Sequence, residues 1–219
     1  MTTKKRRRGA GGVASSSLTS FAYVTANSRD GSNVTSYTFS GQSIGTADAD
    51  RVVIVHCSGW KQGGGQTGFA SVTIAGVTAT EIVSYVEPGF ASDTCGIFAA
   101  AVPSGTTGDI VITYDLSNAS FGIAIYRMIN PDGVAAHDTD FVDGDNSTCA
   151  LSIDTLEDGA IVMGSASTTA STTSGGTEDD ERDMRSNEWT SASSSEPTSF
   201  GAGTAISRAA GKIAVGASW

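Results

Sequence analysis

The chain has 219 residues and a formal net charge of −10, because 13 Lys and Arg face 23 Asp and Glu. This length allows one large domain or two small ones, and it is enough to bury a core without disulfides or metals. Gly, Ser, Thr and Ala are abundant, whereas the helix formers Leu and Lys are scarce. β-branched residues favour strands, and Gly and Ser favour the turns between them, so the composition predicts an all-β protein.

The three cysteines are widely spaced and odd in number: Cys57, Cys95 and Cys149. This pattern excludes a disulfide framework and a zinc-binding motif, and we expect buried thiols. The sequence also predicts neither a signal peptide nor membrane association. The basic start is followed by small polar residues, where an export signal needs a run of about 7–15 apolar ones. No stretch approaches the roughly 18 apolar residues of a membrane span.

Charge divides the sequence sharply. A basic run fills positions 4 to 8 and consists of Lys4, Lys5, Arg6, Arg7 and Arg8. The other 211 residues carry eight basic and 23 acidic side chains, a balance of −15. Residues 1–17 lack hydrophobic periodicity, which predicts a flexible, extended basic arm. Residues 18–219 are expected to form a single domain.

Short apolar runs separated by turn residues follow the arm. They are residues 21–26, 36–41, 51–59, 69–76, 80–87, 95–102, 109–115, 121–129, 149–153, 160–167 and 211–219. This spacing is typical of a sandwich or barrel. The run "RVVIV" at 51–55 is apolar on both faces, which predicts a central strand. "NPDG" at 130–133 predicts a turn, because Pro presets its own φ and Gly accepts a positive φ.

A long polar stretch covers about residues 165–203. Loops of this length are uncommon in compact domains and are usually functional or disordered. Two interpretations remain open. One or two polar strands lie around "DMRSNEWTSAS", anchored by Trp189, or the stretch is a surface excursion that contacts a partner.

Few residues suggest catalysis. His56 and Cys57 are strand neighbours, whose side chains point to opposite faces, so His56 is not expected to activate the thiol. "GQSIG" at 41–45 matches G-x-S-x-G around Ser43, but a strand follows it where a nucleophile elbow requires a helix. A hairpin is the better interpretation. The glycines at 63–65 follow Lys61 and lack the order of a phosphate-binding loop.

Two acidic runs, at residues 138–145 and 178–183, invite a test for calcium binding. Calcium needs six to eight converging oxygens, and the spacing of an EF-hand loop is broken in the first run. We therefore expect solvated turns, and no metal or other cofactor. Trp60, before the glycine loop, is a candidate contact for a glycan or a neighbouring subunit. It is equally compatible with the edge of the core.

The basic arm has several interpretations. A block of like charges is usually an interaction tail. Its side chains can pair with phosphates, serve as an import signal, or dock on an acidic protein surface. The acidic body would repel a duplex, which favours docking to protein and leaves nucleic acid possible through the arm only.

The stretch "YTFSGQSIGTADADRVVIVHCSGW", with "SVTIAGVTATEIV" and "VPSGTTGDIVITY" after it, resembles β-rich structural proteins of tailed bacteriophages and prophages. The resemblance covers about residues 36–129. It implies a virion protein with an antiparallel two-sheet β-sandwich of jelly-roll type. The implied location is the virion, after assembly in the host cytoplasm.

We therefore expect a non-enzymatic capsid decoration or cement protein. Its partners would be other virion proteins, of the capsid or tail, and copies of itself in a homo-oligomer. A tail-fibre or lectin-like glycan-binding module is the alternative, based on Trp60 and the polar loops. An enzyme such as a glycan hydrolase is a third possibility, but nothing in the sequence brings two carboxylates together at the required separation.

Overall fold

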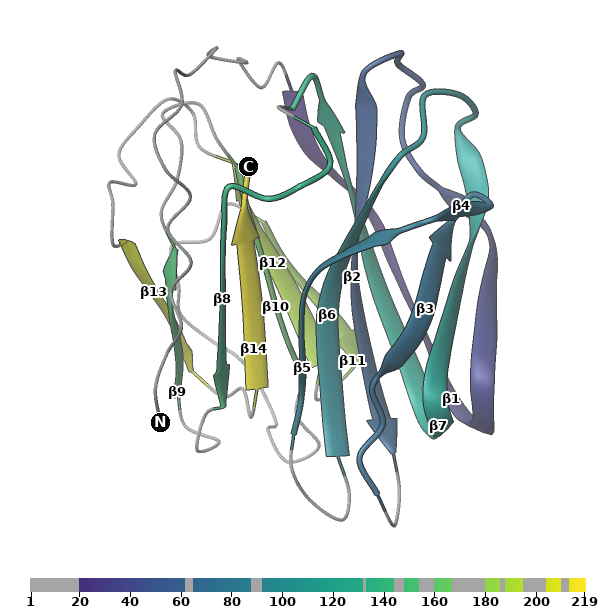
Figure 1. Cartoon of the computed structure of the whole chain (residues 1–219), viewed down its shortest axis with the longest axis vertical. Helices are drawn as coiled ribbons and strands as arrows, with labels where there is room; N and C mark the ends of the chain where they lie inside the picture. Colours follow the sequence, from purple (N-terminus) through teal and green to yellow (C-terminus); the bar gives the residue numbers. More distant parts are fainter. Residues whose placement is uncertain are drawn as a thin grey trace.

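The computed structural model describes residues 20–61, 65–87, 92–131, 133–143, 148–153, 160–166, 180–185, 188–194, 204–209 and 213–219. These residues form strands and connecting turns, with no helix among them, and every strand pairing is antiparallel (Figure 1). The prediction of an all-β protein is confirmed. The predicted arm, residues 1–17 with its basic run at positions 4 to 8, lies outside the described residues.

Two antiparallel sheets pack together. The larger has the order β4 (Val77–Thr78), β3 (Phe69–Ile74), β7 (Thr107–Ile129), β2 (Arg51–Lys61), β6 (Ser92–Ala101) and β5 (Thr80–Val86), and β1 (Ser20–Ser43) also pairs with β7. The second has the order β11 (Asp180–Arg185), β12 (Glu188–Ser194), β10 (Ala160–Ala166), β14 (Ile213–Ser218) and β8 (Asp138–Asp143). A separate pair joins β9 (Thr148–Ile153) to β13 (Thr204–Ala209).

Two polar strands do occupy part of the long polar stretch. They are β11 and β12, which extend the second sheet beyond β10. Trp189 lies in β12, opposite Ser165 of β10 and Asp183 of β11. The interpretation that strands lie around Trp189 is confirmed, so the polar stretch of residues 165–203 is not a surface loop over its whole length.

The strands β1 and β7 are longer than the sequence predicts. Residues 21–26 and 36–41 belong to one strand of 24 residues, and 109–115 and 121–129 to one of 23. The two strands pair along their whole length, from Ser20 opposite Ile129 to Ser43 opposite Thr107, with four shifts in register. Such bulges bend a pair of strands, so β1 and β7 bend together.

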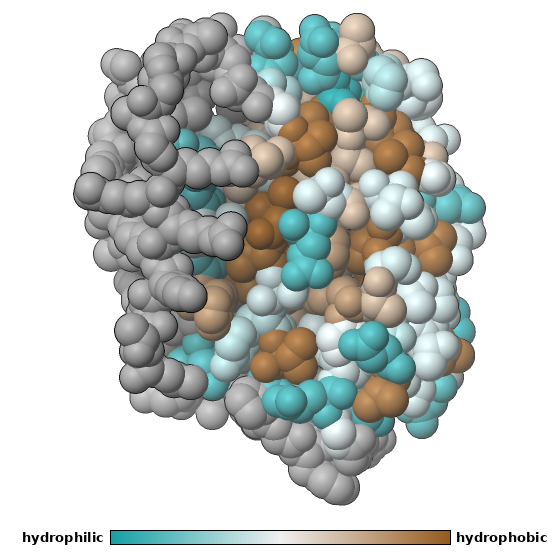
Figure 2. Space-filling view, viewed as in Figure 1, coloured by the Kyte–Doolittle hydropathy of each residue, from teal (hydrophilic) through white to brown (hydrophobic). Residues whose placement is uncertain are grey.

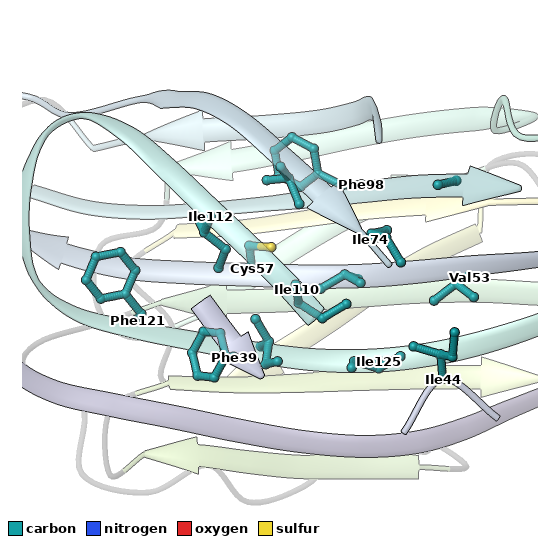
Figure 3. Close-up of a cluster of buried hydrophobic side chains, with 14 of the residues drawn as sticks. Phe39, Ile44, Val53, Cys57, Ile74, Phe98, Ile110, Ile112, Phe121 and Ile125 are labelled. Carbon is teal, nitrogen blue, oxygen red and sulfur yellow. The ribbon is translucent and has the colours of Figure 1, made fainter. Parts of the chain in front are cut away.

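The bend makes the larger sheet fold back on itself. On its free side β7 pairs with β3 through residues 110–114 and with β2 through residues 120–129. Side chains from both halves of β7 share one buried cluster, shown in Figure 3. Phe69 of β3 packs against Phe98 of β6 with ring centroids 4.8 Å apart, although these strands are not sheet neighbours. Tyr114 and Phe121, on either side of the bend, are 5.4 Å apart.

A second core lies between the two sheets. Val52 and Ile54 of β2 point into it, whereas Val53 and Val55 point into the first core. The prediction that this run is a central strand with both faces buried is therefore confirmed. Val215, Ala217 and Trp219 supply the facing side of the second core. The indole Nε1 of Trp219 donates a hydrogen bond of 3.1 Å to the carbonyl of Val134.

Arg51 holds the loops at the start of β2. Its guanidinium is buried and donates to the carbonyl oxygens of Val102 at 2.6 Å, Gly45 at 2.8 Å and Ser104 at 2.8 Å. A planar guanidinium has enough donors to bind several carbonyls at once. Arg51 therefore ties the loop after β1 to the loop after β6, and its role is structural.

Candidate functional site

The side chains that suggested catalysis lie in the interior. His56 and Cys57 are fully buried, and Cys57 belongs to the first core. His56 lies opposite Ile97 and Ala124, whose side chains belong to the second core, so it faces the other way. Burial lowers the pKa of His56 to about 3 and raises the pKa of the Cys57 thiol far above its usual range. Both groups are neutral at physiological pH, as expected of structural residues.

The other candidates take ordinary structural positions. Ser43 is the last residue of β1, and a buried Ile44 and a turn lead from it to β2. The flanking Gly41 and Gly45 have φ of 62° and 78°, conformations that favour glycine. β1 and β2 each pair with β7 and not with each other, so the hairpin expected at "GQSIG" is not formed and the segment connects two strands that flank β7. Lys61 ends β2; Gly63 and Gly64 lie outside the described residues, and Gly65 has a φ of 94°.

Trp60 lies in β2, opposite Asp93 of β6 and Ser120 of β7. Its side chain lies outside the described part of the structure, so its predicted contact with a glycan or a subunit stays a prediction. Of the other cysteines, Cys95 is buried, and the side chain of Cys149 is not described.

The end of β2 that leads to Lys61 is closely packed and polar. A Cβ on Gly59 would overlap the Tyr114 hydroxyl and come within 3.0 Å of Asn118 Nδ2. The Thr94 hydroxyl donates to the carbonyl of Thr67 at 2.7 Å, and the Leu116 amide donates to Thr67 Oγ1 at 3.1 Å. These bonds fix the segment before β3 against β6 and β7.

An exposed aromatic group lies where β5 and β8 meet, at the junction of the two sheets. Phe141 of β8 is 53 % exposed, and its ring stacks on Tyr85 of β5 with centroids 5.0 Å apart and an interplanar angle of 20°. The Tyr85 hydroxyl donates a hydrogen bond of 3.0 Å to Asp143 Oδ2. We call Tyr85, Phe141 and Asp143 the aromatic–carboxylate edge.

The local sequence explains this arrangement. Side chains alternate between the two faces of a strand, so Phe141 and Asp143 of β8 share one face. β8 is the last strand of its sheet and β5 the last of the larger one, which leaves one side of each without a strand neighbour in its own sheet. The stacked rings and the hydrogen bond hold Phe141 and Asp143 in fixed positions across the junction.

The hydrogen bond also affects the ionisation of Tyr85. Partial burial, the bond to Asp143 and the negative charge of Asp143 together raise the pKa of Tyr85 to about 12. The phenol therefore remains a donor at physiological pH, and Asp143 remains its acceptor. The exposed part of the edge consists of an aromatic face beside a carboxylate.

This edge was missed in the sequence, where residues 138–145 were expected to form a solvated turn. That expectation is wrong for Asp138–Asp143, which form strand β8 and pair with β14. The alternation of Asp138 and Asp140 with Thr139 and Phe141 was the available signal, but the neighbouring Gly and Asp residues favoured a turn. Within the described residues, no group of three His, Cys, Asp or Glu side chains is placed to hold a metal ion.

The surface around the edge is partly apolar and carries one fixed carboxylate. Asp143 shares the face of Phe141, whereas Asp138 and Asp140 alternate onto the opposite face of β8. The strands β5, β8 and β14 contain no Lys or Arg. Figure 2 shows apolar side chains near the middle of the face that carries β5 and β6, interspersed with polar ones. Such a surface suits a cationic ligand with an apolar or planar part.

Among the described residues, no helix is long and apolar enough to cross a membrane. Comparison of the chain with protein-family models, with curated proteins and with solved structures gives no match of any of the three kinds.

Proposed function

We propose that this protein is a non-enzymatic structural component of a bacteriophage virion, a decoration or cement protein on the capsid. The fold that fits this role is a two-sheet antiparallel sandwich of jelly-roll type, with the basic residues 4 to 8 as a docking arm. Its partners are other virion proteins and further copies of itself. Nucleic acid is contacted, if at all, through the arm.

The proposal is carried by one observation: the reactive side chains are buried, and a fixed aromatic and acidic group is exposed. The reactive groups His56, Cys57 and Cys95 are sealed inside the two cores. The exposed aromatic–carboxylate edge, in contrast, is held in place by stacking and a hydrogen bond. A body with an inert interior and a fixed adhesive edge fits assembly better than catalysis. The resemblance over residues 36–129 agrees with this assignment.

The proposal is tested on particles of the phage or prophage that encodes the chain. An antibody raised against residues 20–219 should label the heads of purified particles in negative-stain electron microscopy. Particles from a strain with the gene deleted are the control. Label on tail fibres would favour the glycan-binding alternative, and intact particles that lack the protein altogether would refute a virion role.

A further inference from the structure

We propose that the aromatic–carboxylate edge of one copy binds the basic segment Lys4–Arg8 of a second copy. This inference rests on the proposed structural role and names the surface that its arm contacts. One guanidinium of the segment lies on the exposed ring face of Phe141 and bonds to Asp143.

The geometry of the edge fits a guanidinium. One side of the Phe141 ring stacks on Tyr85, yet the residue is 53 % exposed, so the opposite face is open to solvent. Guanidinium groups stack on aromatic faces and also form charge-assisted hydrogen bonds to carboxylates. Asp143 is exposed on the same face of β8 and is fixed by Tyr85. The two features that arginine recognises are therefore adjacent and preorganised, which lowers the entropic cost of binding.

The chain already uses this chemistry once. The guanidinium carbon of Arg29 lies 5.2 Å from the centroid of the Tyr37 ring, and Nη1 donates to the Tyr37 hydroxyl at 3.4 Å. Both residues belong to β1, and Arg29 is exposed. An exposed arginine on a partly buried aromatic ring is thus a contact that this chain forms.

Charge favours the same pairing. The basic run contains five cationic residues in a row, and the rest of the chain has a balance of −15. Asp143 supplies a negative charge on the face of β8 that carries Phe141, and neither β8 nor β5 contains a cationic residue. The attraction between opposite charges on the two surfaces steers association, and this attraction weakens as the salt concentration rises.

The distance within one copy favours a second copy as the source of the segment. Ser20 and Arg51 both lie opposite Ile129, at one end of β7. Tyr85 and Ser58 both lie opposite Cys95 of β6. Tyr85 is therefore seven residues away from Ser20 along the strand direction and four strands away across the sheet. At about 3.3 Å per residue and about 4.8 Å per strand, the two points are about 30 Å apart through the sheet. Arg8 and Ser20 are 12 residue steps apart, and a coil of that length spans about 20 Å on average. Its path must also go around the body.

Cross-linking of the full-length chain tests the proposal. Unlabelled and ¹⁵N-labelled copies are mixed, and a carbodiimide joins lysine amines to nearby carboxylates. We expect linked peptides that join Lys4 or Lys5 to carboxylates of β8, in pairs that combine one light and one heavy peptide. Sedimentation should show self-association that weakens with salt and is lost when residues 1–8 are deleted.

Variants give the specific readout. The double variant Phe141→Ala/Asp143→Asn should weaken self-association at least about tenfold, as loss of a stacked, hydrogen-bonded guanidinium contact does. The matched control is Leu116→Ala/Asp115→Asn, which also removes an exposed apolar side chain and an exposed carboxylate, on β7. It should leave association and cross-links unchanged. Thermal unfolding of both variants shows whether each is folded.

Three results would overturn the proposal. They are cross-links confined to single copies, equal effects of the two double variants, and an arm that binds DNA but leaves no links to β8. None of them bears on particle labelling, so this docking can fail while the virion role stands. A chain that self-associates through β8 but is missing from particles would refute only the virion role.

Discussion

Acid should destabilise this protein through His56. The side chain is fully buried between the sheets, and none of the described residues hydrogen-bonds either ring nitrogen. Burial lowers its pKa from 6.5 to about 3. The unfolded chain therefore takes up a proton below pH 6.5 that the folded chain does not accept until about pH 3. Stability is complete above pH 6.5 and is lost as the pH falls from 6.5 towards 3.

The size of the effect follows from the two pKa values. Each pKa unit corresponds to about 1.36 kcal/mol, so the loss reaches about 5 kcal/mol once the pH is below both values. At pH 5 the unfolded imidazole is almost fully protonated and the folded one is neutral, which gives a loss of about 2 kcal/mol. This is a large part of the 5–15 kcal/mol that stabilises a typical domain.

The assay compares the wild type with His56→Leu, so that contributions from all other titrating groups cancel. Urea unfolding free energies are measured at pH 7, 6 and 5. Between pH 7 and pH 5 the unfolding free energy of the variant should rise by about 2 kcal/mol relative to that of the wild type. His137→Gln, at an exposed position, is the control and should show no such gain.

A constant difference between wild type and variant across this pH range would refute the reasoning. If the Leu variant does not fold, an NMR titration of the wild-type imidazole decides the question. A folded-state midpoint near 6.5 would show that His56 is accessible to protons and does not lie in a sealed core.

Three further outcomes follow from the packing. Gly59→Ala should cost about 1–3 kcal/mol in urea unfolding, since its methyl group overlaps the Tyr114 hydroxyl, and adding Tyr114→Phe should recover part of the loss. Arg51→Lys should cost at least about 3 kcal/mol, because a lysine cannot reach the three carbonyls that the guanidinium binds; an unchanged urea midpoint would contradict the clamp. Cys57 should react with a thiol reagent only as fast as the protein unfolds, as located by peptide mass spectrometry, and rapid labelling of the native chain would exclude its placement in the core.

The sequence predicts the strands well where local pattern decides them. "RVVIV" fills both cores from one strand, and this followed from its apolar residues on both faces. β1 and β7 were each expected as two strands, because "LSNAS" at 116–120 and the polar residues near Asn33 are typical of turns. Their continuity comes from pairing between residues 64 to 109 positions apart, and local composition carries no information on such pairing.

The candidate site was harder to predict for a similar reason. Phe141 in isolation reads as one apolar residue among aspartates. Its role depends on Tyr85, 56 residues earlier, which stacks on it from the other sheet. The exposure of an edge depends on strand order, and strand order is a property of the whole fold.

The partnership of β1 with β7 also sets the order in which the protein can fold. β1 is made first, but Ser20 cannot pair until Ile129 has been synthesised, 109 residues later. At about 5–20 residues per second, the earliest strand waits some 5–20 s on the ribosome for its partner. Contacts this distant in sequence slow folding, and an unpaired strand of 24 residues can associate with other chains meanwhile. In the folded chain the bulges of β1, and the hydrogen bond that the Ser28 amide donates to Asn27 Oδ1, interrupt the regular ladder that another chain would need for pairing.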